Sequence, residues 1–563
     1  MKKTIRAIYF IIFLTSFSFS DTTVVAFNSV HQSFGSLGNY RVVTDTISFP
    51  ESNQQYAEII MTVMLECPGG GCDPWDRKAN IKVEHLNNWF EIGRYVTPYG
   101  IGCSWSFDVT DYRSLLEGDV SLRSFIDTWV QPGWLVTISF DFISGVPENP
   151  FTVVRNIWNY DYVVYGDTTN PVDITPETEY LPMDVTEVNL RMITTGHGQG
   201  NTENAAEFSL KLHDIYMNNE LAYVHNFWRD DCEYNQCSPQ YGTWQYDRAG
   251  FCPGDKVHHQ DFYVMNFVSA GDTVRLEYVL EDYFNQCSPN NPSCVDGITC
   301  SECSYNNSGH TEPNYFIESQ LIMHTESYHT NADTYLSFVE ISGSSPTVDI
   351  YMENYVPVYG IQFNILIDLL DGIEVGELIF QNGQGGRAED SGWTIGVNDS
   401  GLVVGLAQGT AEPIPPGEGL LTQIPWNGNI QSNLSGTIHF SDVQISGYFG
   451  TELSLELGEP VNIELGLGVN EDITLPLKHK LLNAYPNPFN SIVTIPFQLI
   501  SSQMVFLKIF DLNGKEIITL VDNDMAAGRH YLKWDAGNQS SGVYFSVLEI
   551  GKFIDTKKLI ILK

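Results

Sequence analysis

An apolar residue at every second position is a pattern that recurs along this chain and constrains its fold more than any other feature. Every second residue is apolar from Trp134 to Phe142, and the same pattern occurs over 59–65 and 361–367. Alternation of this kind turns one face of an extended strand toward a core and the other toward solvent. Helical periodicity is scarce, and only one short helix is predicted, from an Asp111 N-cap to Gly118. We therefore expect an all-β chain.

Turn-forming residues divide the chain into modules. Its 47 glycines and 26 prolines suit many short strands joined by tight turns, and 43% of its 563 residues are hydrophobic. A typical domain has roughly 100–200 residues, so three to five domains are expected. The turns place four β-sandwiches at about 22–168, 169–326, 333–470 and 478–563.

Charge and the N-terminal residues indicate export. With 28 basic and 69 acidic residues the formal net charge is -41, which argues against nucleic acids and anionic membranes as partners. Lys2, Lys3 and Arg6 precede an apolar run and then small residues, so 1–20 is predicted to be a removable secretory signal. No later stretch approaches the ~18 apolar residues of a membrane span. A soluble, exported protein is expected.

All ten cysteines precede position 304, and an even number in an exported chain favours disulfides. Cys67 and Cys72 are five positions apart and can close a small loop over three glycines. A zinc cage formed by Cys287, Cys294, Cys300 and Cys303 is the alternative for the last four cysteines.

The residues after this loop, Trp75-Asp76-Arg77, carry the first chemical signal. An aromatic face can stack on a sugar ring, while a neighbouring carboxylate binds hydroxyl groups or moves protons. A structural contact between Asp76 and Arg77 is the alternative.

Two later segments resemble known modules. The runs at 403–407 and 413–419 resemble cohesin-like sandwiches, with a plain spacer or binding sandwich as the alternative. The motifs at 485–490, 510–515 and 542–545 resemble the C-terminal sorting domain of the type IX secretion system, whose machinery would be a partner. An ordinary immunoglobulin-like domain is the alternative there, and both interpretations place the protein outside the cell.

Several separated blocks resemble the peptide N-glycosidase F family in order and spacing. They are Cys72–Arg77, Glu91–Tyr99, Asp108–Tyr112, Thr128-Trp129, Ala206-Glu207 with His213, and Asp247–Gly254. The resemblance runs from about 40 to 325 and implies two adjacent jelly-roll-like sandwiches. It also implies an amidase that cleaves between an asparagine side chain and the first N-acetylglucosamine of an N-glycan, leaving aspartate.

The resemblance assigns roles to individual residues. Asp76 matches the principal catalytic aspartate, Glu207 a second essential carboxylate, and Asp127 a position where the family has a supporting glutamate. The residues matched to substrate binding are Trp75, Arg77, Trp129 and Arg248. The disulfides it implies are Cys67–Cys72 and Cys237–Cys252. No metal or cofactor is called for, and the substrates would be N-glycoproteins or glycopeptides.

Three departures from the family pattern stand out. Asp127 is one methylene shorter than glutamate, Ala205 and Ser209 replace a disulfide around Glu207, and the segment 287–303 looks like an insertion. The loop of Glu207 is therefore expected to be less constrained than in the family.

Other functions fit the sequence less well. A copper centre would need a His-x-His motif, and the sequence has the adjacent pair His258-His259 but no His-x-His. A serine hydrolase would need Gly-x-Ser-x-Gly, which the sequence also lacks. A non-catalytic exported protein that binds glycoproteins through Trp75 and Trp129 is the main alternative, and a glycosidase acting between sugars is a weaker one. The third and fourth modules contain no comparable constellation and are expected to add nothing to bond cleavage.

Overall fold

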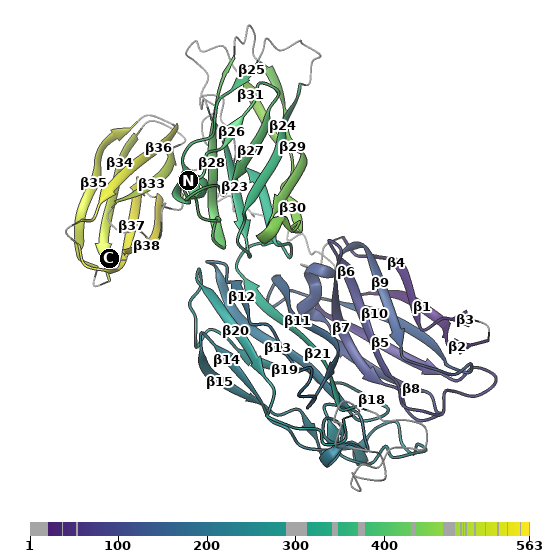
Figure 1. Ribbon diagram of the computed structural model, residues 1–563. Coiled ribbons are helices and arrows are strands. Elements are labelled where there is room, and N and C mark those ends of the chain that lie inside the picture. The colour runs from purple at the N-terminus through teal and green to yellow at the C-terminus, as the bar shows by residue number, and fades with distance from the viewer. Residues whose placement is uncertain are drawn as a thin grey trace, which may run out of the picture. The chain divides into compact units, whose positions relative to one another are not determined.

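A computed structural model gives the fold of this chain (Figure 1). It describes residues 21–561 apart from 37, 52–54, 289–311, 340–346, 370–377, 429–433, 466–478, 483, 485, 486, 488, 490, 491, 500–502, 513, 526, 527, 538 and 552. The chain divides into two compact units, Met1–Leu467 and Gly468–Lys563. Among the described residues, no helix has the length and apolar character needed to cross a membrane. The predicted signal segment 1–20 lies outside the described residues.

The prediction of an all-β chain built from sandwiches is confirmed. The described helical segments are short: η2 Thr110–Leu115, η3 Thr202–Asn204, η4 Cys232–Tyr234, α1 Gly386–Asp390 and η5 Tyr448–Gly450.

The first sandwich combines a four-stranded sheet of order β1-β10-β5-β8 with a five-stranded sheet of order β18-β7-β6-β9-β4. The strands are β1 Thr22–Gln32, β4 Val42–Phe49, β5 Tyr56–Glu66, β6 Lys78–His85, β7 Asn88–Val96, β8 Cys103–Asp108, β9 Gly118–Ile126, β10 Trp134–Ser144 and β18 Asp255–Lys256. A short hairpin, β2 Phe34–Gly35 with β3 Gly38–Asn39, stands beside them.

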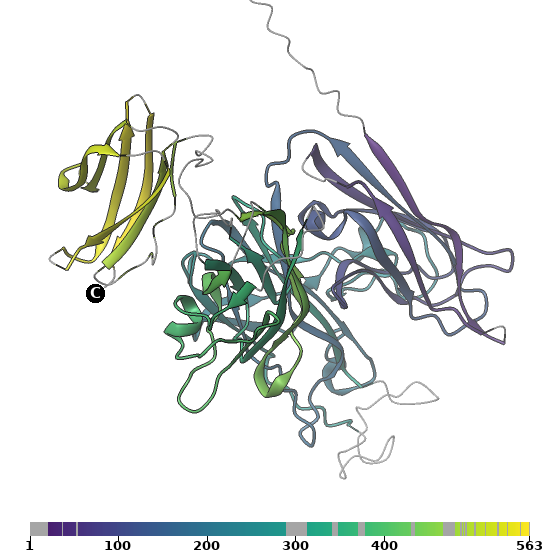
Figure 2. The ribbon, with the colours of Figure 1, turned by 90° about the horizontal axis from the view of Figure 1, so that it is seen from above.

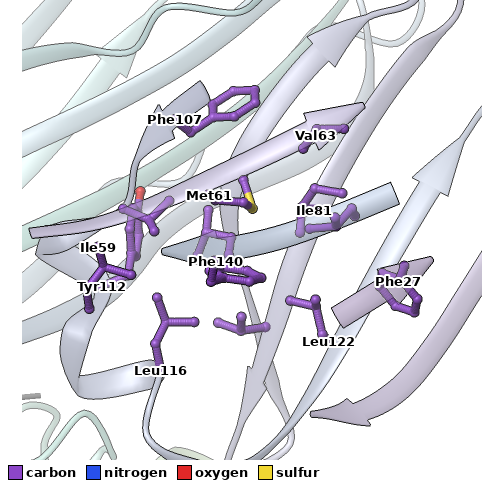
Figure 3. Close-up of a cluster of buried hydrophobic side chains, with 14 of the residues drawn as sticks. Phe27, Ile59, Met61, Val63, Ile81, Phe107, Tyr112, Leu116, Leu122 and Phe140 are labelled. Atoms are coloured by element: carbon purple, nitrogen blue, oxygen red, sulfur yellow. The ribbon is translucent and has the colours of Figure 1, made fainter. Parts of the chain in front are cut away.

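The core of this sandwich follows from the alternation in its strands. Figure 3 shows Met61 of β5 and Phe140 of β10 among side chains that meet others from the facing sheet, including Ile81 of β6 and Leu122 of β9. All four side chains are fully buried. Burying a side chain of this size contributes roughly 1.5–3 kcal/mol, so the alternating strands supply the main driving force for this fold.

The second sandwich has sheets of order β11-β21-β13-β19 and β12-β20-β14-β15. Its strands are β11 Phe151–Val164, β12 Glu177–Tyr180, β13 Val185–His197, β14 His213–Met217, β15 Glu220–His225, β19 Gln260–Tyr263, β20 Thr273–Val279 and β21 Asn314–Thr325, with a small pair formed by β16 Trp228–Arg229 and β17 Arg248–Ala249.

The strand β11 precedes the division expected at 168, yet it belongs to the second sandwich. It pairs with β21 from Phe151 to Val164 and places Val153 and Trp158 in the second core. The turn at Gly166 ends a strand, and the expected division there would separate β11 from its sheet. Local turn residues do not reveal which sheet the preceding strand joins.

Buried charged side chains join the first two sandwiches, which lie side by side in Figure 2. Lys82 of β6 pairs with Glu318 of β21 at 2.9 Å, and Arg94 of β7 pairs with Glu91 at 2.6 Å. Arg94 also donates to the main-chain oxygen of Phe316 in β21 at 2.9 Å. Removing one partner of such a buried pair leaves an uncompensated charge, at a cost of about 3–5 kcal/mol. The Lys82–Glu318 pair and the bond from Arg94 to β21 therefore fix how the two sandwiches meet.

The third sandwich has sheets of order β25-β28-β23-β22-β30 and β26-β27-β24-β29-β31. Its strands are β22 Thr334–Phe338, β23 Thr347–Asn354, β24 Gly360–Leu369, β25 Leu378–Phe380, β26 Gly396–Val397, β27 Leu402–Leu406, β28 Gly417–Gly428, β29 Leu434–Ser446, β30 Leu455–Leu457 and β31 Val461–Leu465. Charged contacts join it to the second sandwich: Arg155 pairs with Asp333 at 2.8 Å, and His329 lies 2.7 Å from Asp184 and 2.9 Å from Glu353.

The second unit has sheets of order β32-β33-β36 and β35-β34-β37-β38 around a core of its own. Its strands are β32 Lys480–Leu481, β33 Ile492–Leu499, β34 Gln503–Asp511, β35 Glu516–Met525, β36 Gly528–Asp535, β37 Gly542–Ile550 and β38 Phe553–Ile561.

The helix predicted to start at Asp111 differs in form. Thr110–Leu115 is a 3-10 helix, and no side chain caps it. Asp111 instead accepts hydrogen bonds from Arg191 at 2.8 Å and contacts His324 at 3.1 Å. Burial opposes ionisation of Asp111, but these two partners outweigh it and lower its pKa. The Asp111 side chain therefore makes charge-assisted bonds to the second sandwich instead of the helix cap that the sequence predicts.

Candidate active site

The site begins at one edge of the five-stranded sheet, where β6 starts and β9 ends. Asp76 and Arg77 directly precede β6, and Asp127 directly follows β9. Ala79 lies opposite Ile126 across these antiparallel strands, and the main-chain N–H of Asp127 donates to the oxygen of Lys78 at 3.0 Å. Two sequence segments that are 50 residues apart thus reach the same edge because they flank paired strands.

Asp73 anchors the loop that carries Asp76. Its fully buried carboxylate accepts from the Arg77 Nε at 2.7 Å, from the Thr128 hydroxyl at 2.7 Å and from the Trp75 main-chain N–H at 3.0 Å. The disulfide Cys67–Cys72 closes the preceding turn, as expected. Arg77 is therefore paired with Asp73 and not with Asp76, which corrects the structural alternative drawn from the sequence.

Asp76 is partly buried and is linked to the second sandwich through a chain of hydroxyl groups. Its carboxylate is hydrogen-bonded to Tyr99, whose oxygen lies 3.4 Å from the Thr243 hydroxyl. Thr243 in turn accepts from the Arg248 Nη2 at 2.9 Å, which leaves its proton free to point at Tyr99 and the Tyr99 proton free to point at Asp76. Burial raises the pKa of Asp76, although the positive charge of Arg248 opposes this.

Glu207 shares Arg248 with Asp76. Its Oε1 accepts from the Arg248 Nε at 3.2 Å, and its Oε2 accepts from the Gly198 main-chain N–H at 3.0 Å. Burial raises the pKa of Glu207, Arg248 lowers it, and the negative charge of Asp76 raises it again. Two carboxylates with raised pKa, within electrostatic reach of each other and of one guanidinium, are candidates for groups that transfer protons.

Arg248 donates hydrogen bonds to several protein acceptors at this site. It is 1% exposed, and besides Glu207 and the Thr243 hydroxyl it donates to the main-chain oxygens of Thr243 at 2.9 Å and Tyr246 at 3.1 Å. The guanidinium thus serves mainly as a fixed positive charge behind the two carboxylates.

The loop of Glu207 is held without the disulfide that the resemblance implies for the family. Ala205 and Ala206 are fully buried, and the main-chain oxygen of Glu207 accepts from Ala249 at 2.9 Å. Ala206 has φ = 68°, a left-handed conformation that costs of order 1–3 kcal/mol and persists only where its surroundings impose it. Gly198 has φ = 110°, and a Cβ there would lie 2.5 Å from the oxygen of Glu312. Close packing thus constrains the Glu207 loop at the place where the resemblance implies a disulfide in the family.

Asp127 lies among a second set of side chains at the same edge. Arg41, which precedes β4, reaches its Oδ1 from Nη1 at 3.3 Å and lies 4.2 Å above the ring of Trp129. Phe34 contacts Trp129 edge to face, with ring centroids 5.3 Å apart. Trp129 is 53% exposed and Trp75 is 59% exposed, so both rings are open to a ligand from solvent.

One predicted disulfide pairing is wrong. Cys237 bonds to Cys103 and Cys252 bonds to Cys232, so Cys237–Cys252 does not form. Cys103 lies in the first sandwich, and spacing along the chain does not reveal that Cys237 reaches it. Cys287 is also disulfide-bonded, whereas the rest of the predicted zinc alternative, Cys294, Cys300 and Cys303, lies outside the described residues.

Histidines do not form a copper centre in the part of the chain that the structure describes. His197 stacks on Phe251 at 4.9 Å, and burial lowers its pKa to about 3, so it is neutral. Within the described residues, the group whose ligand atoms lie close enough to share a metal ion is His329, Glu353 and Glu418, at the joint with the third sandwich.

Three site residues carry no role in the sequence analysis. Tyr99 and Thr243 connect the two carboxylates across the sandwiches, and Asp73 fixes the loop between Cys72 and Arg77. A signal existed only for Asp73, because Asp-Pro starts turns in which the aspartate accepts from the backbone N–H two residues on.

Comparisons with known proteins show which families this chain matches. Residues 78–142 match the family described as Peptide-N-glycosidase F, N terminal, residues 165–297 match Peptide-N-glycosidase F, C terminal, and residues 483–562 match the Secretion system C-terminal sorting domain. Peptide-N(4)-(N-acetyl-beta-D-glucosaminyl)asparagine amidase F of Elizabethkingia miricola is 31% identical over 286 residues, which cover 47% of this chain and 80% of that protein.

Solved structures give matches of the same kind. A crystal structure of peptide-N(4)-(N-acetyl-beta-D-glucosaminyl)asparagine amidase is 26% identical, covering 55% of this chain and 97% of its own, with a TM-score of 0.48. PNGase F, a glycosylasparaginase from Flavobacterium meningosepticum, is also 26% identical over 55% of this chain and 98% of its own, with a TM-score of 0.48.

Proposed function

Since this chain belongs to the peptide-N-glycosidase F family and is an amidase of that family, we propose that Asp76 and Glu207 form its catalytic pair. The proposed reaction hydrolyses the bond between asparagine and N-acetylglucosamine in N-glycoproteins, releasing the glycan and leaving aspartate. One observation carries the assignment: two partly buried carboxylates, both with raised pKa, share the charge of Arg248.

Asp76 is proposed as the proton-transfer group. An amide is a poor electrophile, so water must lose a proton as it attacks and the departing glycosylamine must gain one. The raised pKa of Asp76 brings its basicity closer to neutral pH than an ordinary aspartate allows. Its hydrogen bond from Tyr99 orients the carboxylate.

Glu207 is proposed to hold the attacking water and adjust the basicity of Asp76. Both of its oxygens are fixed by protein donors, Arg248 and Gly198, so its position does not depend on substrate. A neighbouring negative charge raises the pKa of a carboxylate, and this effect acts in both directions between Asp76 and Glu207. The positive charge of the Arg77 guanidinium also acts on Asp76, and from this position it can stabilise negative charge that develops on the amide oxygen.

Substrate binding is assigned to the exposed rings and to Asp127. The faces of Trp75 and Trp129 can stack on pyranose rings, and Asp127 can accept hydrogen bonds from sugar hydroxyl groups. Arg248 is proposed to contribute through the carboxylates, since its donors are largely used by the protein.

The decisive experiment incubates the secreted protein with a denatured N-glycoprotein and measures the peptide mass. Conversion of asparagine to aspartate, a gain of about one mass unit, is expected at each released site. Asp76→Asn should lower turnover about 10²–10⁴-fold with glycan affinity retained. Asp119→Asn, at the other end of β9, is the matched control and should leave turnover unchanged. Glycan binding without amidase activity, equal in wild type and Asp76→Asn, would instead establish the non-catalytic binding protein.

The remaining modules are proposed to serve export and attachment. The sorting domain directs secretion or cell-surface localisation; we assign it to the type IX pathway, through the periplasm. The third sandwich is proposed to be cohesin-like, on the segments 403–407 and 413–419, which overlap β27 and the start of β28. Deleting 478–563 should leave the protein in the periplasm, as fractionation would reveal.

A further inference from the structure

Arg41 lies at the substrate edge of the first sandwich, although no family motif includes it. It directly precedes β4, the strand next to β9, and its main-chain oxygen accepts from Ile126 at 3.0 Å. Ile126 is the last residue of β9, so Arg41 and Asp127 are placed at adjacent strand ends. The position of Arg41 is thus set by sheet pairing.

The Arg41 side chain is fixed from several sides. Its Nε donates to the Asn39 amide oxygen at 3.0 Å, and its Nη1 donates to Asp127 at 3.3 Å. The guanidinium carbon lies 4.2 Å from the ring centroid of Trp129 and 5.1 Å from that of Phe34. Only 20% of the side chain is exposed, so the guanidinium is held at a defined place.

This contact covers one face of Trp129 and neutralises Asp127. A planar guanidinium stacks on an aromatic face and binds a carboxylate at the same time, which an ammonium group does less well. With Arg41 on one side, the exposed remainder of Trp129 is oriented for a sugar ring, and the Asp127 carboxylate is held for its hydroxyl groups.

We propose that Arg41 is a positioning residue for substrate recognition, which orients Trp129 and Asp127 together. This inference rests on the proposed function, because it concerns the binding of the same N-glycan. Arg41 contacts Asp127 and Trp129 and not the proton-transfer groups. Its effect is therefore on the affinity for substrate rather than on the chemical step.

Kinetics on a glycopeptide substrate test the proposal. Arg41→Ala should raise KM about tenfold and change kcat less than twofold, the signature of lost ground-state binding. Arg41→Lys, which keeps the charge but loses the planar stacking, should restore part of the affinity. Arg123→Ala is the matched control, because Arg123 stacks 3.9 Å from the ring of Trp89 on the same sheet, away from the site.

A double-mutant cycle tests whether Arg41 acts through Asp127. If it does, Arg41→Ala combined with Asp127→Asn should raise KM little further than Asp127→Asn alone. The inference is overturned if wild type is active and Arg41→Ala keeps its KM within twofold, or if the two effects simply multiply. A wild-type protein without amidase activity would refute the proposed function instead. Should Arg41→Ala fail to fold, the Arg41→Lys comparison decides.

Discussion

Replacing Asp73 by asparagine should destabilise the protein and weaken catalysis, although Asp73 is not itself a catalytic residue. The substitution keeps the size of the side chain but removes its charge. One of its two carboxylate oxygens becomes an NH2 group, and that oxygen now accepts from donors such as Arg77 and Thr128. A threonine hydroxyl can rotate to accept, whereas the Arg77 N–H cannot, so a donor would face a donor.

The size of the effect follows from burial. Asp73 is 0% exposed and the Arg77 side chain is 17% exposed. Breaking a fully buried pair costs about 3–5 kcal/mol, and the residual exposure of Arg77 lets water compensate in part, so about 2–3 kcal/mol is expected. Asp73 lies in the unit Met1–Leu467, and for a unit of that size this loss lowers the unfolding midpoint by about 2–3 °C. Loss of the anchor also displaces Asp76, and a shift of about 1 Å can cost about 10²-fold in kcat/KM.

Calorimetry at pH 7 and glycopeptide hydrolysis check both expectations. Asp119→Asn removes the same charge from the same sandwich at an exposed position that bonds only to Ser48 among the contacts described, and it should change neither quantity. A midpoint for Asp73→Asn within about 0.5 °C of wild type, together with kcat/KM within threefold, would refute the reasoning, because ΔΔG would then be only about 0.5 kcal/mol.

Further measurements address the other groups. In the pH profile of kcat/KM, the midpoint of the acid limb should lie above the ordinary carboxyl pKa of about 4, because burial raises the pKa of Asp76. Glu207→Gln removes a like charge and should therefore move the acid limb of the residual activity to lower pH. Burial opposes protonation of His329, but Glu353 and Asp184 raise its pKa to about 9, so it stabilises the fold fully below about pH 6.5 and loses this as pH rises through 9. Thermal melts should thus separate His329→Gln from wild type at pH 6 and bring them together near pH 10. A chain ending at residue 467 should keep full activity, whereas one ending at 328 loses Asp333, the partner of buried Arg155, and should melt at a lower temperature.

The alternating strands and the recurrent motifs could be predicted from the sequence because they depend on neighbours along the chain. Alternation from Trp134 to Phe142 specifies a strand with one buried face wherever it is placed. The loop closed by Cys67–Cys72 likewise depends on residues only five positions apart. Asp76 and Glu207 could be singled out only by resemblance, since neither stands in a local pattern that specifies its partners.

The tertiary structure alone decides which distant groups meet. The pairing of Cys103 with Cys237, 134 positions apart, and the place of β11 beside β21 in the second sandwich depend on distant segments that no local pattern brings together. The same holds for the chain of contacts from Asp76 through Tyr99 and Thr243 to Arg248. Local conformation is set by steric and solvation preferences of neighbouring residues, whereas the partners, burial and pKa of a side chain depend on strands brought together by the whole fold.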